Sequence, residues 1–208
     1  MLNHHGRSLG PLATNAYAFR ARDGWVAVDA PEGAADWLEG LGVRPELLLL
    51  THQHFDHVLG AAAVVDAFGC PVWTFAEPSS ELTLETMFRG LEGTAFEIGQ
   101  YEISRTIDPT PEGEAIDVLG TAVEVLHVPG HSPDSLCFVL RPGEVVFGGD
   151  VLFAGGIGRT DFPGGDAELL LLGIREKLFP LGDGFTIYPG HGPETTIGQE
   201  RTGNPFFV

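Results

Sequence analysis

Residues 51–57 read Thr-His-Gln-His-Phe-Asp-His. This short stretch holds four candidate metal ligands, His52, His54, Asp56 and His57, in a chain of 208 residues with only eight histidines. Imidazole and carboxylate are ligands that zinc, iron and manganese accept in mixed nitrogen and oxygen sites. The density of these groups predicts a metal-binding segment rather than a loop of polar surface residues.

The spacing within this stretch predicts two directions for its side chains. An apolar run at 47–50 precedes it and is typical of a strand buried on both faces. His52 and His54 lie two residues apart, so in extended backbone their side chains share one face. Asp56 and His57 are adjacent at the start of a predicted helix, where neighbouring side chains diverge by about 100°. One segment can therefore supply ligands to two neighbouring metal positions.

Three further candidate ligands follow singly, each at a glycine-containing corner: His131 in Pro-Gly-His-Ser, Asp150 in Gly-Gly-Asp, and His191 in Pro-Gly-His-Gly. Alone, either histidine would be read as an ordinary loop residue and the aspartate as a cap or turn residue. Asp150 also ends an apolar run, where a buried carboxylate needs a cation or several hydrogen-bond donors. Their order along the chain predicts one site with seven ligands.

The pattern of strands and helices predicts an α+β fold. We expect it to contain two packed mixed β-sheets with helices on the outer faces, in a single domain spanning 1–208. Predicted strands cover 15–19, 25–29, 47–50, 72–75, 123–128, 136–140, 145–148 and 185–188. Predicted helices cover 33–41, 56–68 and 167–179, and 77–116 is expected to form a helical excursion with loops.

Composition narrows the classes of partner. The 11 basic and 29 acidic residues give a net charge of −18, which argues against a nucleic acid or an anionic membrane as partner. Cys70 and Cys137 lie in apolar surroundings and are expected to be core residues rather than a disulfide pair. A leader segment and an apolar run of membrane-spanning length are both missing from the sequence, so we expect a cytoplasmic protein. Its oligomeric state cannot be read from these patterns.

These motifs resemble those of the metallo-β-lactamase superfamily, whose fold is a four-layer αββα sandwich. Three stretches narrow the resemblance to short glyoxalase II-like hydrolases. They are the segment around His131, the segment from Asp150 through Gly-Arg-Thr-Asp-Phe-Pro-Gly at 158–164, and the segment from Tyr188 past His191 to Asn-Pro-Phe at 204–206.

The resemblance implies a site for two divalent metal ions, zinc above all, with iron and manganese as alternatives. His52, His54 and His131 would hold one ion, Asp56, His57 and His191 the other, and Asp150 would bridge both. The implied reaction is hydrolysis of a hydroxyacylglutathione-like thioester by a hydroxide shared between the ions. Asp150 and Asp56 would be catalytic, Asp56 as a proton acceptor as well as a ligand.

The implied partner is thus a small-molecule thioester, and Arg159 is the expected substrate-binding residue. Glyoxalase II-type enzymes carry a basic residue facing glutathione at this place, and an arginine can pair bidentately with a carboxylate. We expect a single domain without the additional C-terminal glutathione-binding domain of the long enzymes. Pro193 and Asp134 replace a tyrosine and a glycine usual in the family, which puts the thiol carrier in question.

Three other readings remain open. Persulfide dioxygenases resemble the hydrolases in fold and motifs but use one iron, here held by His52, His131 and Asp150. A lactonase or β-lactamase suits the glycine-rich stretch at 154–165 less well. A metal-binding protein without turnover fits poorly, because structural metal sites are smaller and closed.

Overall fold

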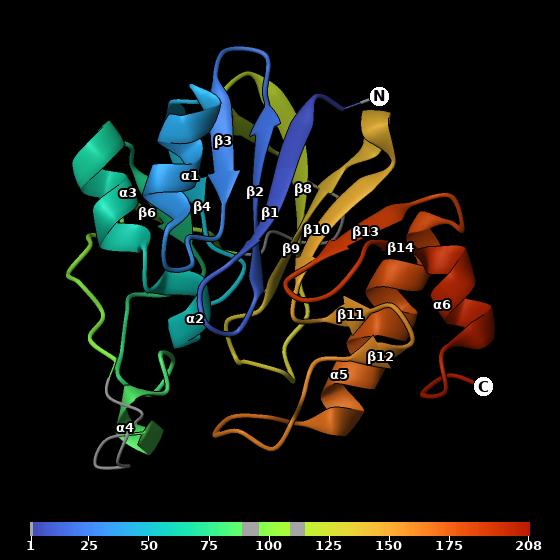
Figure 1. The fold of residues 1–208 in the computed structure, drawn as a ribbon. Coiled ribbons are helices and arrows are strands. Elements are labelled where there is room, and N and C mark those ends of the chain that lie inside the picture. The colour runs from blue at the N-terminus through green and yellow to red at the C-terminus, as the bar shows by residue number, and fades with distance from the viewer. Residues whose placement is uncertain (1, 89–95, 109–114) are drawn as a thin grey trace. The chain divides into compact units, whose positions relative to one another are not determined.

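The computed structural model describes residues 2–88, 96–108 and 115–208 and divides them into two compact units. The first unit runs from Leu2 to Asp108, and the described residues of the second run from Ala115 to Val208. Each unit is built on one mixed six-stranded sheet (Figure 1). The expectation of a single domain over the whole chain stays a prediction.

The sheet of the first unit has the strand order β1-β2-β3-β4-β5-β6. Its first three strands are antiparallel neighbours, and the remaining neighbours are parallel. The strands are β1 (His4–Leu9), β2 (Thr14–Arg20), β3 (Trp25–Val28), β4 (Pro45–Leu49), β5 (Val72–Thr74) and β6 (Arg105–Thr106).

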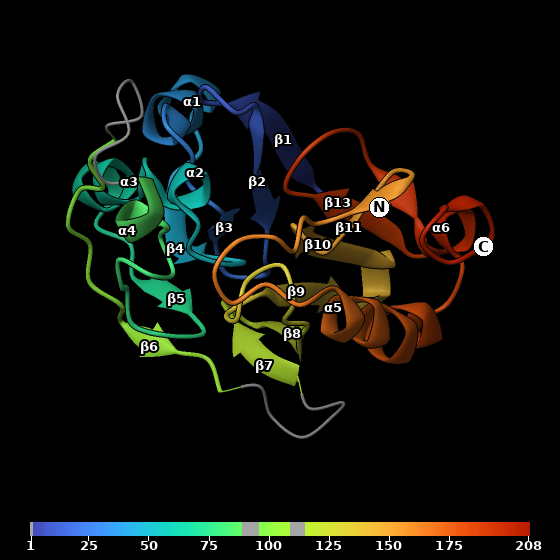
Figure 2. The same ribbon diagram turned by 90° about the horizontal axis from the view of Figure 1, so that it is seen from below.

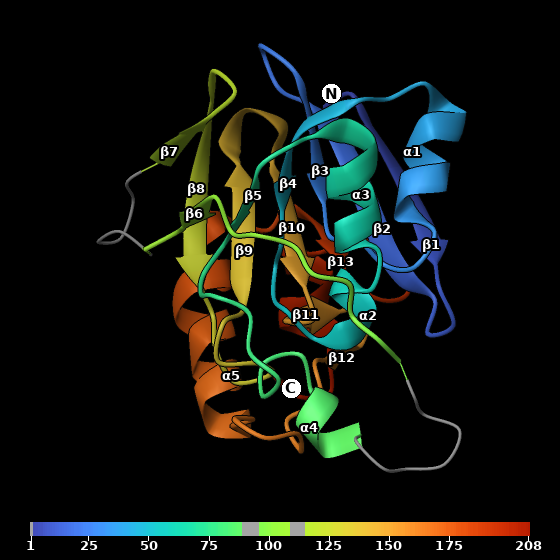
Figure 3. The ribbon, with the colours of Figure 1, turned by 90° about the vertical axis from the view of Figure 1, so that its left-hand side faces the viewer.

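The helices of the first unit are α1 (Ala34–Leu41), α2 (Phe55–Val58), α3 (Ala61–Phe68) and α4 (Glu85–Phe88). Leu38 of α1 and Val64 of α3 belong to one buried apolar cluster with Ala18, Leu48 and Val72 of the strands. Figure 3 shows α1 and α3 on the same side of this sheet. The burial of these apolar side chains is what fixes the helices to the sheet.

The predicted helix over 56–68 is two helices, because the chain breaks at Gly60. A Cβ atom on Gly60 would lie 2.3 Å from the carbonyl oxygen of Pro31. The backbone N–H of Gly60 also donates to the carbonyl of Ala30 at 2.8 Å. This close approach of two backbone segments ends α2 and lets α3 start in a new direction.

The sheet of the second unit has the order β14-β13-β10-β9-β8-β7, with β10 and β13 parallel and the other neighbours antiparallel. A separate short hairpin pairs β11 with β12. The strands are β7 (Ala115–Val118), β8 (Thr121–His127), β9 (Leu136–Leu140), β10 (Val145–Gly149), β11 (Leu152–Phe153), β12 (Gly156–Ile157), β13 (Thr186–Pro189) and β14 (Thr195–Thr196).

The second unit packs its helices on this sheet. α5 (Ala167–Gly173) continues as a π-helical turn (Ile174–Leu178) and a 3-10 turn (Phe179–Leu181), and α6 is Ile197–Gly203. A further 3-10 turn is Arg141–Gly143. Leu170 of α5 and Ile197 of α6 belong to the same buried cluster as Val139, Val146 and Ile187, and Figure 2 shows both helices beside the strands.

Sequence patterns located the central strands and helices but missed others. The strand β1 was not predicted; His4 and His5 lie in it, half-buried, with the ring of His5 5.4 Å from that of Trp25. The segment 77–116 contains α4 and β6 and the start of β7, and its residues 89–95 and 109–114 lie outside the described part. Among the described helices, none combines the length and apolar character that crossing a membrane requires.

Candidate metal centre

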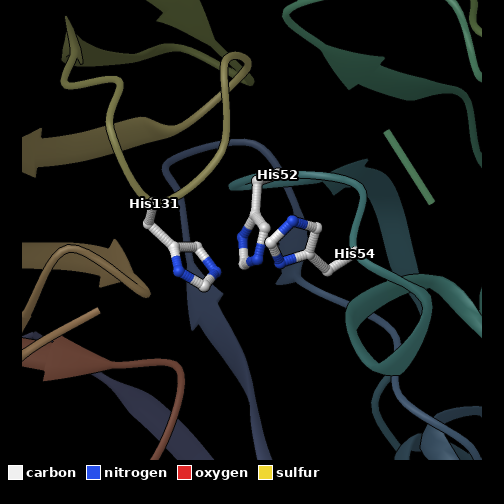
Figure 4. A group of neighbouring side chains, drawn as sticks. All are labelled: His52, His54 and His131. Atoms are coloured by element: carbon white, nitrogen blue, oxygen red, sulfur yellow. The ribbon is translucent and has the colours of Figure 1, made fainter. Parts of the chain in front are cut away.

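The first group of predicted ligands lies on the loop that leaves β4 and enters α2. His52 and His54 flank an extended turn of this loop, with ring centroids 4.7 Å apart, and the rings of His52 and His57 are 4.1 Å apart. Figure 4 shows His52 and His54 pointing toward one another from this loop. The expectation that they share one face is confirmed, and all three histidine side chains are buried.

Asp29 joins the histidines of this loop into one network. β3 and β4 are parallel neighbours, so the residue after β3 and the residues after β4 meet at one edge of the sheet. Asp29 accepts hydrogen bonds from the backbone N–H and the hydroxyl of Thr51, both at 2.8 Å, and lies 2.9 Å from Nδ1 of His57. Nδ1 of His52 lies 3.2 Å from the same Thr51 hydroxyl.

Asp56 is held by a neighbour that no sequence pattern singled out. The hydroxyl of Thr14, at the start of β2, donates to Oδ2 of Asp56 at 2.7 Å. The same carboxylate oxygen lies 3.7 Å from Nε2 of His57. Asp56 and His57 therefore present an oxygen and a nitrogen close together, although adjacent side chains at the start of a helix were expected to diverge.

The second group of predicted ligands gathers at one edge of the other sheet. β8 and β10 run in the same direction, and β10 and β13 are parallel neighbours, so their carboxyl ends meet at that edge. Oδ2 of Asp150 lies 3.4 Å from Nε2 of His131 and 3.5 Å from Nε2 of His191. A hydrogen bond from the Gly190 amide to the Gly149 carbonyl holds the two loops together.

His131 is oriented by a backbone carbonyl. Its Nδ1 lies 2.7 Å from the carbonyl oxygen of Arg159, which can only accept a hydrogen bond. The approach depends on Gly158, where a Cβ atom would lie 1.9 Å from the carbonyl oxygen of Asp150 and 3.0 Å from Cβ of His131. Only glycine lets this backbone segment pass so close to two predicted ligands.

The histidine contacts suit metal binding because they fix the tautomers. The acceptors facing Nδ1 of His57 and His131 place the proton on Nδ1, so Nε2 carries the lone pair. The Thr51 hydroxyl gives its own proton to Asp29, so it accepts from Nδ1 of His52, with the same result. A neutral imidazole whose unprotonated Nε2 offers its lone pair is the form that binds a cation.

Arg159 has an exposed side chain that is already engaged. Its Nε and Nη2 donate to the two carboxylate oxygens of Asp161 at 2.7 and 2.6 Å, and its guanidinium lies 3.9 Å from the ring centroid of Phe162. The hydrogen bonds raise the pKa of Arg159 and lower the pKa of Asp161. Substrate binding by Arg159 stays a prediction.

A sequence model of the metallo-beta-lactamase superfamily matches residues 9–191, most of the chain. The chain belongs to this superfamily. The match covers all seven predicted ligands, although it does not itself assign them a role.

Individual proteins agree with the family match. The hydroxyacylglutathione hydrolase GloC of Haemophilus influenzae is 42% identical over 188 residues, which cover 87% of this chain and 86% of the relative. The crystal structure of the BLEG-1 B3 metallo-beta-lactamase superposes with a TM-score of 0.85 at 35% identity and covers 99% of this chain and 100% of its own. The crystal structure of TTHA1623 in a di-iron-bound form superposes with a TM-score of 0.83 at 36% identity. It covers 97% of this chain and 99% of its own.

These similarities confirm the predicted fold, two mixed sheets with flanking helices in the metallo-β-lactamase class. Within each unit the predicted ligands lie together, four on the loop after β4 and the helix α2 that follows it, and three near the carboxyl ends of strands. Sequence reasoning missed groups that orient these ligands, namely Thr14, Thr51 and the carbonyl of Arg159. Thr51 could have been found from its sequence position, because it is a polar residue directly after a strand. The Arg159 carbonyl could not, because every residue has a backbone carbonyl.

Proposed function

We propose that this protein is a metal-dependent hydrolase that cleaves a hydroxyacyl thioester of the glutathione type. The observation that carries the proposal is the paired set of ligand groups, each with the histidine tautomers that a divalent cation requires. Similarity to a hydroxyacylglutathione hydrolase over 86% of that relative's length supports the substrate class. The di-iron form of TTHA1623 supports a site for two ions.

The seven ligands are assigned as the family resemblance implies. His52, His54 and His131 would hold one ion, Asp56, His57 and His191 would hold the other, and Asp150 would contribute to both. The short distances from Asp150 to Nε2 of His131 and of His191, which belong to different ions in this assignment, support the bridging role. Zinc is the proposed metal, since it accepts this mixture of nitrogen and oxygen ligands.

Divalent cations at such a site lower the pKa of water and polarise a carbonyl group. The chain contributes the remaining functions. Asp56, which accepts a hydrogen bond from the Thr14 hydroxyl, is the proposed proton acceptor. Arg159 binds a carboxylate of the thiol carrier through the guanidinium edge opposite the one that Asp161 occupies. A thiolate leaves without needing a protein acid.

The direct test is thioester hydrolysis, followed by release of free thiol from lactoylglutathione, together with metal content per chain. We expect turnover with two ions per chain in protein purified without chelators. One iron per chain and oxygen consumption with a persulfide substrate would instead identify a dioxygenase. Absence of tightly held metal would contradict the ligand assignment itself.

Arg159→Ala tests substrate recognition separately. Loss of a charge-assisted hydrogen bond costs about 1.5–3 kcal/mol, so we expect KM for a carboxylate-bearing thioester to rise roughly tenfold or more, with kcat little changed. Arg22→Ala is a suitable control, because Arg22 is also an exposed arginine and contacts the adjacent Asp23. Unchanged KM in the Arg159 variant would refute carboxylate recognition.

A further inference from the structure

Glu200 is a buried carboxylate for which the proposed chemistry has no use. It lies on α6, is 4% exposed, and accepts three hydrogen bonds. The donors are the hydroxyl of Thr195 at 2.5 Å, the amide of Asn204 at 2.8 Å and the backbone N–H of Gly155 at 2.9 Å. A buried carboxylate is tolerated only with such donors.

Asn204 makes a second hydrogen bond to the backbone of the β11–β12 hairpin, beside the one that Glu200 makes. Its side-chain amide donates to the carbonyl oxygen of Gly156 at 3.0 Å, in addition to its bond with Glu200. Glu200 and Asn204 thus hold one N–H and one C=O at the tip of the hairpin. A hairpin with two residues per strand has little stability of its own, so these contacts determine where it lies.

The hairpin leads directly into the substrate-binding segment. β12 is followed by Gly158 and Arg159, and the Gly158 amide donates to the carbonyl of Val151 at 3.3 Å. The carbonyl of Arg159 accepts from Nδ1 of His131 at 2.7 Å. The position of the hairpin therefore determines where the Arg159 side chain leaves the backbone. It also determines where the Arg159 carbonyl meets His131, a predicted ligand.

We propose that Glu200 and Asn204 are positioning residues that clamp the β11–β12 hairpin and thereby place Arg159 for recognition of an anionic thioester. The inference rests on the proposed function for its substrate, but the clamp itself does not. It gives the C-terminal helix a role in substrate specificity, although the helix carries none of the seven predicted ligands.

The test compares Glu200→Ala with Glu200→Gln. Glutamine can place its carbonyl oxygen toward Gly155 and Asn204 and its amide toward the hydroxyl of Thr195. That hydroxyl can then give its proton to Gln199, whose Oε1 lies 3.2 Å away. Glu200→Gln should therefore keep the hydrogen bonds to Thr195, Asn204 and Gly155 that Glu200→Ala removes. Thr202→Ala is the matched control, because Thr202 is exposed on the same helix and donates within it.

We expect Glu200→Ala to raise KM for a carboxylate-bearing glutathione thioester about tenfold, the loss of one charge-assisted contact, and KM for an uncharged alkyl thioester less than twofold. Glu200→Gln and Thr202→Ala should match the wild type with both substrates. Equal losses with both substrates, or a Glu200→Gln variant as impaired as Glu200→Ala, would overturn the proposal.

Hydrogen exchange separates the clamp from the proposed function. The peptide covering 152–159 should exchange faster in Glu200→Ala but not in Glu200→Gln, whether or not the protein hydrolyses thioesters. If the wild type is inactive and exchange still follows this pattern, the proposed function fails and the clamp stands. Unchanged exchange overturns the clamp. If Glu200→Ala does not fold, Asn204→Ala, which removes the contact with Gly156, provides the same comparison.

Discussion

At the scale of single residues, Asp29 shows how a carboxylate outside the ligand set can control the site. Three donors, two from Thr51 and one from His57, point at its two oxygens. Asp29 has a φ of +59°, a conformation that asparagine also tolerates. Asp29→Asn therefore keeps the backbone. Because the backbone N–H of Thr51 can only donate, the asparagine oxygen faces it, and the amide N–H₂ faces Nδ1 of His57, so the favoured tautomer of His57 is lost.

We expect Asp29→Asn to weaken metal binding about 10- to 100-fold, the usual effect of removing the hydrogen-bond partner of a ligand histidine. The measurement is metal retained per chain against a competing chelator. Asp66→Asn, an exposed carboxylate in the same unit, serves as control. Equal metal retention in both variants would show that Asp29 does not orient His57.

The two cysteines provide a prediction about reactivity and pH. Burial raises the pKa of Cys70 and raises that of Cys137 to about 12. We expect neither thiol to react with a disulfide reagent at pH 8 in the native protein, and both to react in denaturant. Rapid labelling of the native protein would contradict the buried placement of that thiol.

The raised pKa of Cys137 also makes stability depend on pH. Its folded-state pKa lies above the unfolded value of about 8.5, so the folded protein keeps a proton that the unfolded chain releases. The free energy of unfolding should therefore fall by about 2 kcal/mol between pH 8 and pH 10 through this group. Urea unfolding at both pH values should show a smaller fall in Cys137→Ala.

The seven ligand candidates could be named from sequence because their residue types and glycine corners are unusual together. The groups that hydrogen-bond these ligand candidates could not be named from sequence. The bond from His131 to the Arg159 carbonyl joins residues 28 positions apart through a group that every residue has. Thr14 reaches Asp56 across 42 positions, and threonine at the start of a strand is common.

At the scale of elements, the predicted strands were correct where apolar runs are continuous, as in β4 and β9. The edge strands β1 and β14 lack such runs, because β1 is mostly polar and partly exposed and β14 consists of two threonines. The helix over 56–68 was predicted as continuous because its apolar spacing does not record a contact with Pro31. Gly60 was the available signal, since glycine inside a helical pattern often has a packing reason.

Gly60→Ala tests this interpretation. Its Cβ would meet backbone oxygen at 2.3 Å, so we expect a loss of about 1–3 kcal/mol in unfolding free energy. Gly40→Ala in α1 is the matched control, because nothing lies within 4 Å of its added Cβ. That variant should be neutral or more stable by up to about 1 kcal/mol. Chemical denaturation of both variants would show whether the close approach at Gly60 exists.

At the scale of the whole molecule, the net charge of −18 bears on the proposed function. Acidic groups repel one another and repel an anionic thioester at long range. Divalent cations at the proposed site would offset part of this charge where the ligands gather. The unfavourable composition thus argues for strong local binding groups rather than against an anionic substrate.

Metal removal should accordingly destabilise the protein. A ligand present at about 100 times its Kd stabilises the folded state by about 2.7 kcal/mol, which for a chain of this size is roughly 5–10 °C in Tm. We expect a chelator to lower Tm by that amount and added zinc to restore it. Asp150→Asn should unfold at the lower temperature with or without chelator, because the proposed bridging carboxylate is gone, while Asp66→Asn should respond as the wild type does. A wild-type Tm that ignores both chelator and zinc would mean that the seven side chains hold no ion that matters to the fold.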